Sequence, residues 1–173
     1  MLITCIIFVA LYIIDQLTKY WAMDLVGTKE VIPNFLSLEL TYNKGAAWGM
    51  MEDNTPILVL ISIIVSIILG YFCIKNDWKK HKFMSFSLTM ALAGCVGNLY
   101  DRFISITPLS EGRECVVDMI VFEPLNVISR AITGSNFPIF NVADVYLVLG
   151  LIFFAIDYLF FYEKRVKKYS QEI

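Results

Sequence analysis

The chain has 173 residues, of which 58% are hydrophobic and 17% charged, and its 14 Lys+Arg and 16 Asp+Glu give a net charge of -2. Soluble domains carry about a quarter charged residues, so this composition excludes a disordered chain and disfavours a basic nucleic-acid binder or a multi-domain enzyme. It fits one integral membrane domain, 1–173.

Four apolar segments are long enough to cross a bilayer, which takes about 20 helical residues. They are 2–23, 56–74, 83–100 and 137–162. None shows the alternation of a membrane barrel. The first lacks a basic start and an evident cleavage site, so we expect it to remain as a helix. The sequence therefore predicts an all-α integral membrane fold, a four-transmembrane-helix bundle.

The basic residues predict the orientation of this bundle, because cytoplasmic loops carry an excess of Lys and Arg. Eight of the 14 lie between the second and third spans or after the fourth: Lys75, Lys79, Lys80, Lys82, Lys164, Arg165, Lys167 and Lys168. Four spans put both stretches, and both termini, on the predicted cytoplasmic side. The segments 24–55 and 101–136 then face outward.

Charged residues inside a span cost about 2.5–3.5 kcal/mol each at its centre, so each needs a reason. Asp15 and Lys19 are four residues apart on the first span. We favour mutual pairing that pins this span to its neighbours. A Ser-Lys dyad using Lys19 is the alternative, which Asp15 opposes by keeping Lys19 charged. Asp157 is expected only to reach the cytoplasmic interface.

The first outward segment contains an alternating run, 36–42, that predicts a half-buried strand. A turn signal follows at Asn43-Lys44-Gly45, and then a small apolar run, 46–50, in which Trp48 suits the membrane interface. We expect a small extracytoplasmic β-sheet. A simple surface hairpin, or an Asn43 that approaches a substrate backbone, are both open.

The second outward segment is longer and less regular, with Pro108, Gly112 and Gly134. Its stretch 116–122 is nearly all apolar around Asp118. We expect an outer loop at the membrane surface, in which this stretch lies at the interface or dips into the bundle. Long connections of this kind are often functional.

Polar residues gather at the outer end of the third span and the outer start of the fourth: Asn98, Asp101, Arg102, Asn141 and Asp144. Within each span they are three or four residues apart and share a helical face. Antiparallel neighbours bring both groups to the outer membrane level, where Asp118 can join them.

Two of the three outer acids suit a reaction. Asp101 has Arg102 as a neighbour to pair with, whereas Asp118 and Asp144 have no basic residue close in sequence. Two carboxyls in a low-dielectric site do not both ionise easily, so one keeps its proton while the other acts as a base. Such a pair can activate water against an amide carbonyl and protonate the leaving nitrogen. The alternative is that each acid only tethers a helix.

Other hydrolytic schemes lack their residues. The single histidine, His81, lies in the cytoplasmic connection, and there is neither a His-Glu zinc motif nor an outer histidine for a Ser-His-Asp triad.

Five segments resemble, in order, the motifs of the bacterial lipoprotein signal peptidases (signal peptidase II). They are Asp15-Gln16-Leu17-Thr18-Lys19, Asn43-Lys44-Gly45-Ala46-Ala47-Trp48-Gly49, Gly97-Asn98-Leu99-Tyr100-Asp101-Arg102, Val116-Val117-Asp118 and Phe140-Asn141-Val142-Ala143-Asp144. The resemblance covers about residues 11–150, and five ordered motifs on a four-span chain are specific. The stretches 102–118 and 118–141 are longer than is usual in the family, and Met119 stands where Phe is commoner.

The resemblance implies an intramembrane aspartic endopeptidase, the target of globomycin. Such enzymes remove the signal peptide of a diacylglyceryl-modified prolipoprotein on the amino side of the lipidated cysteine. It also implies a bacterial inner-membrane location with the active site at the extracytoplasmic face. The expected partners are the lipid-modified substrate and membrane lipids, with no cofactor, metal, nucleic acid or obligate protein partner.

The resemblance also assigns residues. Asp118 and Asp144 match the catalytic pair. Positions that line the substrate pocket match Asn43, Gly45, Asn98, Arg102 and Asn141, of which Asn98 and Asn141 are expected to orient the acids or hold the substrate main chain. Structural positions match Asp15, Lys19 and Asp101.

Two other classes of function are weighed beside this one. A small transporter or channel would need polar groups through the membrane thickness, whereas the second span is uncharged. A non-catalytic assembly protein would use the acids only as helix tethers.

Overall fold

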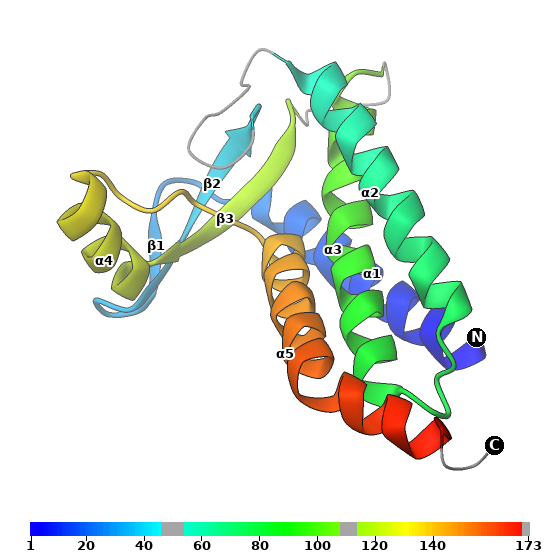
Figure 1. Cartoon of the computed structure of the whole chain (residues 1–173). Coiled ribbons are helices and arrows are strands. Elements are labelled where there is room, and N and C mark those ends of the chain that lie inside the picture. The colour runs from blue at the N-terminus through cyan, green and yellow to red at the C-terminus, as the bar shows by residue number, and fades with distance from the viewer. Residues whose placement is uncertain (46–53, 108–113, 171–173) are drawn as a thin grey trace.

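The computed structural model describes residues 1–45, 54–107 and 114–170, with side chains as far as Phe161. The elements in chain order are α1 (Leu2–Ala22), β1 (Lys29–Ile32), β2 (Leu36–Asn43), α2 (Thr55–Lys75), α3 (Lys82–Ser105), β3 (Val116–Phe122), α4 (Glu123–Thr133) and α5 (Val142–Ser170). Four long helices form a bundle, and the sheet and α4 lie to one side of it, beside the end where α5 begins (Figure 1).

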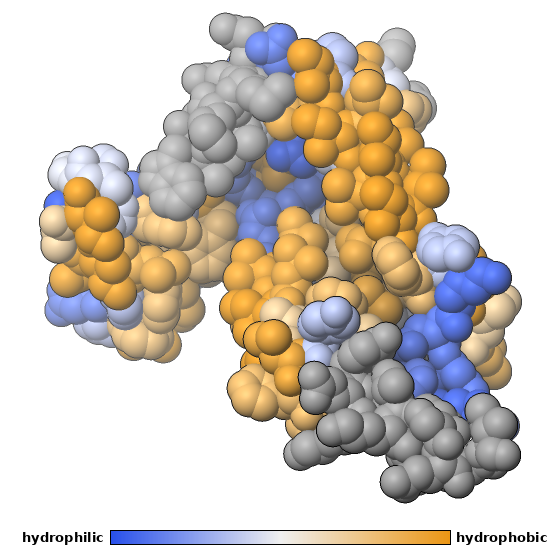
Figure 2. Space-filling view, viewed as in Figure 1, coloured by the Kyte–Doolittle hydropathy of each residue, from blue (hydrophilic) through white to orange (hydrophobic). Residues whose placement is uncertain are grey.

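The predicted membrane bundle with a small sheet is confirmed. Within the described ranges, four helices are long and apolar enough to cross a bilayer: Leu2–Ala22, Thr55–Lys75, Lys82–Ser105 and Val142–Phe161. Apolar side chains cover the visible faces of α2 and α5 (Figure 2). A surface of this kind is stable against lipid rather than water.

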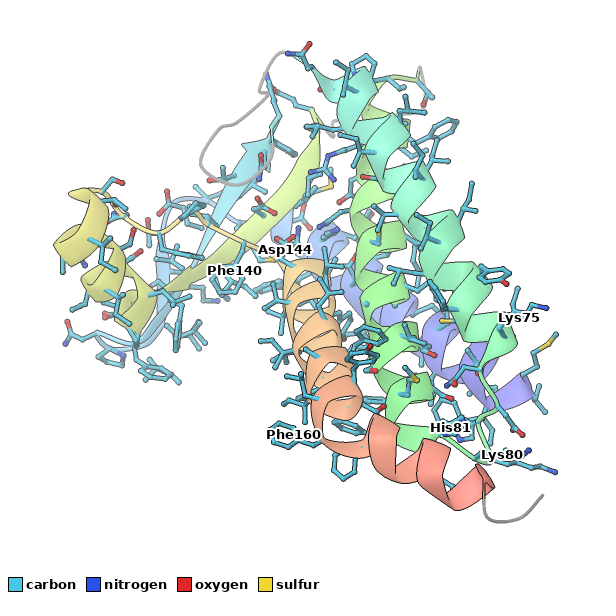
Figure 3. The ribbon with its side chains drawn as sticks, viewed as in Figure 1. Lys75, Lys80, His81, Phe140, Asp144 and Phe160 are labelled. Carbon is cyan, nitrogen blue, oxygen red and sulfur yellow. The ribbon has the colours of Figure 1, made fainter. Side chains whose placement is uncertain are left out.

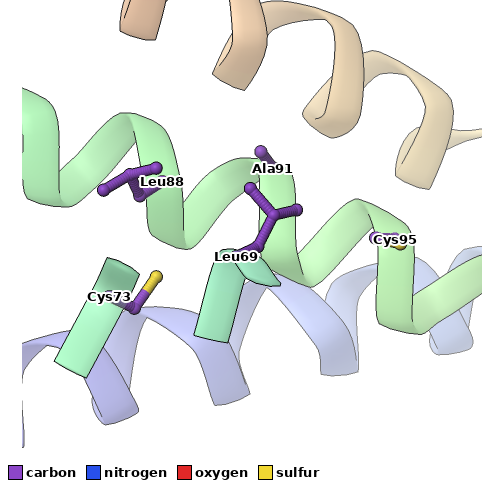
Figure 4. Close-up of a cluster of buried hydrophobic side chains, with 5 residues drawn as sticks. All are labelled: Leu69, Cys73, Leu88, Ala91 and Cys95. Carbon is purple, nitrogen blue, oxygen red and sulfur yellow. The ribbon is translucent and has the colours of Figure 1, made fainter. Parts of the chain in front are cut away.

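Helix α3 is the centre of the bundle and packs against α1, α2 and α5. Its buried side chains are mostly small, which lets neighbouring backbones come close. On the α2 side, a cluster of Leu69, Cys73, Leu88, Ala91 and Cys95 fills the contact (Figure 4). On the α5 side, glycine at positions 94 and 150 lets the two backbones approach closely.

The α3–α5 contact requires glycine at position 94. A Cβ atom on Gly94 would lie 2.2 Å from the carbonyl oxygen of Ala143. We therefore expect Gly94→Ala to lower the free energy of unfolding by about 1–3 kcal/mol, as overpacking does. Chemical denaturation of the purified protein in detergent measures the change.

Gly70→Ala is the matched control for this variant. Gly70 also lies within a helix, but a Cβ there meets nothing within 4 Å. Its stability should stay level or rise slightly, because alanine is the better helix former. Equal stability of both variants would contradict the close α3–α5 contact.

The three strands form an antiparallel sheet in the order β1-β2-β3. Strand β2 covers the predicted run 36–42. Strand β3 forms the stretch 116–122, for which the sequence leaves both an interfacial and a buried position open, and its first half is buried. Its first four residues, 116–119, are buried, and Val117 and Met119 pack with Ala22 at the end of α1. A strand that is buried on both faces shows no alternation of apolar and polar residues, so the sequence pattern did not predict it.

Three expectations are corrected. The fourth long helix begins at Val142, because residues 137–141 are extended and Phe140 bridges to Ile120. Helix α4 had no predicted counterpart. Asp157 is buried within the protein rather than exposed at its surface. The predictions for 46–50 with Trp48, for Pro108 and Gly112, and for the side chains of the basic tail concern residues outside the described parts.

Candidate active site

Buried polar side chains gather where α1, α3, β3 and the start of α5 meet. They include Asp15, Lys19, Asn98, Asp101, Asp118 and Asn141. A hydrophilic surface lies between the sheet and the helices, framed by apolar side chains (Figure 2). Asp144 stands at the first turn of α5, just after Phe140 (Figure 3). The polar residues predicted to converge therefore do share one region.

Asn141 and Asp144 cap the start of α5 reciprocally. The backbone N–H of Asp144 donates to Asn141 Oδ1 over 2.9 Å, and the backbone N–H of Asn141 donates to Asp144 Oδ2 over 3.1 Å. This arrangement satisfies two donors that the first helical turn leaves open. The same bonds fix the orientation of the Asp144 carboxyl.

The Asn141 side chain also reaches the second acid. Its Nδ2 donates to Asp118 Oδ1 over 2.7 Å and to Asn98 Oδ1 over 3.0 Å, and the residue is fully buried. Because the backbone N–H of Asn141 donates to the Asp144 carboxyl, Asn141 contacts both carboxyl groups, one through its side chain and the other through its backbone. Geometry thus brings together two acids that are 26 positions apart in the sequence.

Asp118 is held from the sheet side as well. Asn43, at the end of β2, donates from Nδ2 to Asp118 Oδ2 over 3.0 Å, and its own Oδ1 accepts the N–H of Gly45 over 3.0 Å. Pairing of β2 with β3 brings these residues close, because Thr41 lies opposite Asp118. Asn43 and Gly45 therefore line the same region as the two acids.

Asp144 is held from α3 by Asn98. Asn98 Nδ2 donates to Asp144 Oδ1 over 2.7 Å. Its Oδ1 accepts from Lys19 Nζ over 2.8 Å and from Asn141. Because Asn98 Oδ1 accepts both of these hydrogen bonds, Asn98 Nδ2 is the atom that faces the Asp144 carboxyl. Lys19 therefore determines the orientation of Asn98, and through it supports Asp144.

Lys19 is the centre of a buried ion network. Its Nζ lies 3.0 Å from Asp15 Oδ2 and 2.8 Å from Asp101 Oδ2, and all three side chains are fully buried. The predicted Asp15–Lys19 pair is present. Asp15 Oδ1 also accepts the N–H of Ala143 over 2.9 Å, which joins α1 to the start of α5. Spacing along α1 alone gave no signal of this second role.

Asp101 corrects one expectation, since it pairs with Lys19 rather than with Arg102. Neighbouring residues on a helix point in different directions, so Arg102 faces away from Asp101. Its Nη2 donates to the carbonyl oxygen of Gly45 over 3.2 Å. Carbonyl binding, the other role considered for Arg102, is thus seen within the chain itself.

Burial and the neighbouring charge change the acidity of Asp118. Burial, followed by the negative charge of Asp144, raises the pKa of the Asp118 carboxyl from 3.8 to about 7, although hydrogen bonds from Asn43 and Asn141 lower it. A carboxyl of this kind holds its proton over much of the physiological range. The site thus has an acid form suited to donating a proton.

This pKa predicts a pH dependence of stability. The folded chain binds the Asp118 proton more tightly than the unfolded chain does. The free energy of unfolding is therefore highest below about pH 4, and it falls by on the order of 4 kcal/mol as the pH rises to about 7. Asp118→Asn should lack this decline. Unfolding temperatures between pH 4 and 8 test it, and parallel profiles of parent and variant would contradict the raised pKa.

Comparison with known proteins adds a finding of its own. The family model described as signal peptidase (SPase) II matches residues 7–160. A relative named lipoprotein signal peptidase from Enterococcus faecalis is 39% identical over 158 residues, covering 90% of this chain and 86% of the relative. One of the same name from Staphylococcus haemolyticus is 34% identical and covers 89% of both chains.

Solved structures agree with this similarity. A bacterial membrane enzyme determined by the in meso method has a TM-score of 0.72 and 35% identity, over 90% of this chain and 87% of that one. A second structure of the same description has a TM-score of 0.70 and 35% identity, over 91% and 93%.

Proposed function

This chain belongs to the signal peptidase II family and is therefore a multi-pass membrane aspartic peptidase that cleaves signal peptides from prolipoproteins, and we propose that Asp118 and Asp144 are its two catalytic carboxyls. The observation that carries this proposal is Asn141, whose side-chain amide donates to the Asp118 carboxyl and whose backbone N–H donates to the Asp144 carboxyl. The pKa of Asp118, raised to about 7, supports it, because a large fraction of this carboxyl then keeps its proton near neutral pH.

The proposed reaction uses the pair in two protonation states. Ionised Asp144 takes a proton from a water molecule, whose oxygen attacks the scissile carbonyl carbon. Protonated Asp118 donates to the carbonyl oxygen. As the tetrahedral intermediate collapses, the C–N bond breaks and the leaving nitrogen receives the proton held by Asp144. One hydroxyl of the intermediate returns its proton to Asp118 as the new carbonyl group forms, so both acids regain their starting forms. Asn98 and Asn141 orient the acids throughout.

The lipid on the substrate explains a site at the membrane surface. Each CH₂ group buried in lipid contributes about 0.8 kcal/mol, so removing a diacylglyceryl group from the bilayer would be costly. An active site at the membrane surface avoids this cost, because the lipid chains stay in the bilayer during cleavage. We propose cleavage on the amino side of the lipidated cysteine, with Asn43, Gly45 and Arg102 facing the substrate at the mouth of the site.

The proposed setting is the bacterial inner membrane. We propose that 1–173 forms a single membrane domain with both termini in the cytoplasm and the two acids at the extracytoplasmic face. The position of Lys75 and Lys80 at the opposite end of the bundle from Asp144 supports this orientation (Figure 3).

The test uses purified protein in lipid and two precursor peptides that differ only in the diacylglyceryl group on the cysteine. Mass spectrometry of the products should show cleavage of the lipidated peptide directly before the modified cysteine. The unmodified peptide should remain largely intact. If the enzyme cut both equally well, the proposed role of the lipid would be wrong, and if it cut neither, the proposed substrate would be wrong.

A further inference from the structure

Helix α4 has its polar side buried against the protein and its apolar side exposed. Its polar residues Asn126 and Ser129 face the protein and are only 4% and 6% exposed. Its apolar residues Val127, Ile128 and Ile132 are 59%, 56% and 79% exposed. An amphipathic helix on a water-soluble surface does the opposite. The apolar side of α4 therefore needs an apolar partner outside the chain.

A hydrogen bond to the following segment holds α4 in this orientation. Asn126 Oδ1 accepts the backbone N–H of Phe137, which lies beyond the end of α4, over 3.1 Å. Within the helix, Asn126 Nδ2 donates to Glu123 Oε2 over 2.9 Å, and Arg130 pairs with Glu123. Rotation of the helix to bury its isoleucines would break the bond between Phe137 and Asn126.

The apolar side of α4 extends onto the sheet. The backbone N–H of Glu123 donates to the carbonyl oxygen of Phe35 over 3.0 Å, at the turn between β1 and β2. Phe35 is itself half-exposed and packs edge-to-face on Phe122, with ring centroids 4.9 Å apart. We call Phe35, Val127, Ile128 and Ile132 the α4 patch. Apolar side chains form a strip on the visible side of α4, with more hydrophilic side chains above and below it (Figure 2).

The position of the α4 patch indicates what covers it. Helix α4 lies beside the end of the bundle where α1 ends and α5 begins (Figure 1), and both of these helices are long and apolar enough to cross a bilayer. Exposed apolar area costs roughly 25 cal/mol per Å² in water. A helix with one apolar side and one polar side is stable in the plane of the membrane interface.

We propose that α4 lies in the surface of the bilayer, with the α4 patch in lipid, on the side of the membrane where Asp118 and Asp144 are found. The occupant is bilayer lipid rather than a second copy of the chain. Helices α1 and α5, which are long and apolar enough to cross a bilayer, have ends near α4, so bilayer lipid is within reach of the patch and no further molecule is needed to cover it. This proposal stands whether or not the two acids are the catalytic pair.

Docking of α4 would also position the site. The helix follows β3 directly, and β3 carries Asp118. Through the bond from Phe137 to Asn126, it also holds the segment that leads to Asn141 and Asp144. Lipid contact at α4 therefore fixes the height of both acids relative to the membrane.

The test places a nitroxide spin label on either side of α4 in the full chain in lipid nanodiscs. The two variants are Ile128→Cys and, as the matched control, Arg130→Cys, since these positions lie on opposite sides of the helix. Both are made with Cys5→Ser, because Cys5 is exposed and the other three cysteines are buried. Relaxation by oxygen reports lipid, and relaxation by a water-soluble nickel complex reports water.

We expect the oxygen-to-nickel accessibility ratio to be several-fold higher at 128 than at 130. Equal ratios would overturn the proposal, because both sides of α4 would then be in water. A label at 128 that is shielded from both reagents would also overturn it, since a second copy or another protein would then cover the patch.

Discussion

Asp118→Asn and Asp144→Asn should each reduce cleavage of a diacylated precursor by about 10³-fold or more. Asparagine keeps the shape of the side chain but neither accepts a proton from water nor donates one to the substrate. Each variant removes one half of a pair that acts together, so the double variant should be no less active than either single one. Initial rates from product mass spectrometry measure the loss.

The control for these variants is Glu39→Gln, the same chemical change on an exposed carboxyl of β2 that accepts a hydrogen bond from Thr28. It should retain the parental rate. Thermal unfolding of each variant shows whether the protein is folded. Near-normal cleavage by both aspartate variants would exclude the proposed pair, whereas loss of turnover in a folded Asp101→Asn variant would make Asp101 the better partner.

Lys19→Met is expected to have the largest effect on stability. It removes the ammonium group that lies within 3.0 Å of both Asp15 and Asp101, and it leaves Asn98 Oδ1 without one of its donors. Removing one partner of a buried ion pair costs about 3–5 kcal/mol, because the remaining charge has no compensation. Denaturation in detergent, or the yield of folded protein, measures this loss.

Two comparisons separate the network from a general effect of the substitution. Lys29→Met makes the same change on exposed β1 and should alter the free energy of unfolding by less than about 1 kcal/mol. The triple variant Lys19→Met, Asp15→Asn, Asp101→Asn should be more stable than Lys19→Met alone, because no buried charge remains unpaired. A Lys19→Met protein as stable as the parent would mean that the network is wrongly described.

Much of this molecule could be predicted from local patterns. Long apolar runs predict the four membrane helices, and the spacing of Asp15 and Lys19 predicts their pairing. Alternation predicts β2. In each case the signal lies within a single element and repeats with its period.

The rest depends on contacts between distant segments. Strand β3 is buried on both faces and therefore has no alternation, and α4 fills part of the long stretch 118–141 with its apolar side outward. Asp101 pairs with Lys19 of α1, 82 positions away in the sequence, so the prediction of an ion pair with the adjacent Arg102 was wrong. The two-ended role of Asn141 appears only when β3, α3 and α5 meet.

The position of Asn141 has a consequence for biosynthesis. It caps the start of α5, its side-chain amide donates to the Asp118 carboxyl, and its backbone N–H donates to the Asp144 carboxyl. A ribosome-bound chain that has not yet delivered α5 to the membrane has the strand, the ion network and one acid, but not the link between the acids. We therefore expect the newly made protein to become a peptidase only after α5 inserts.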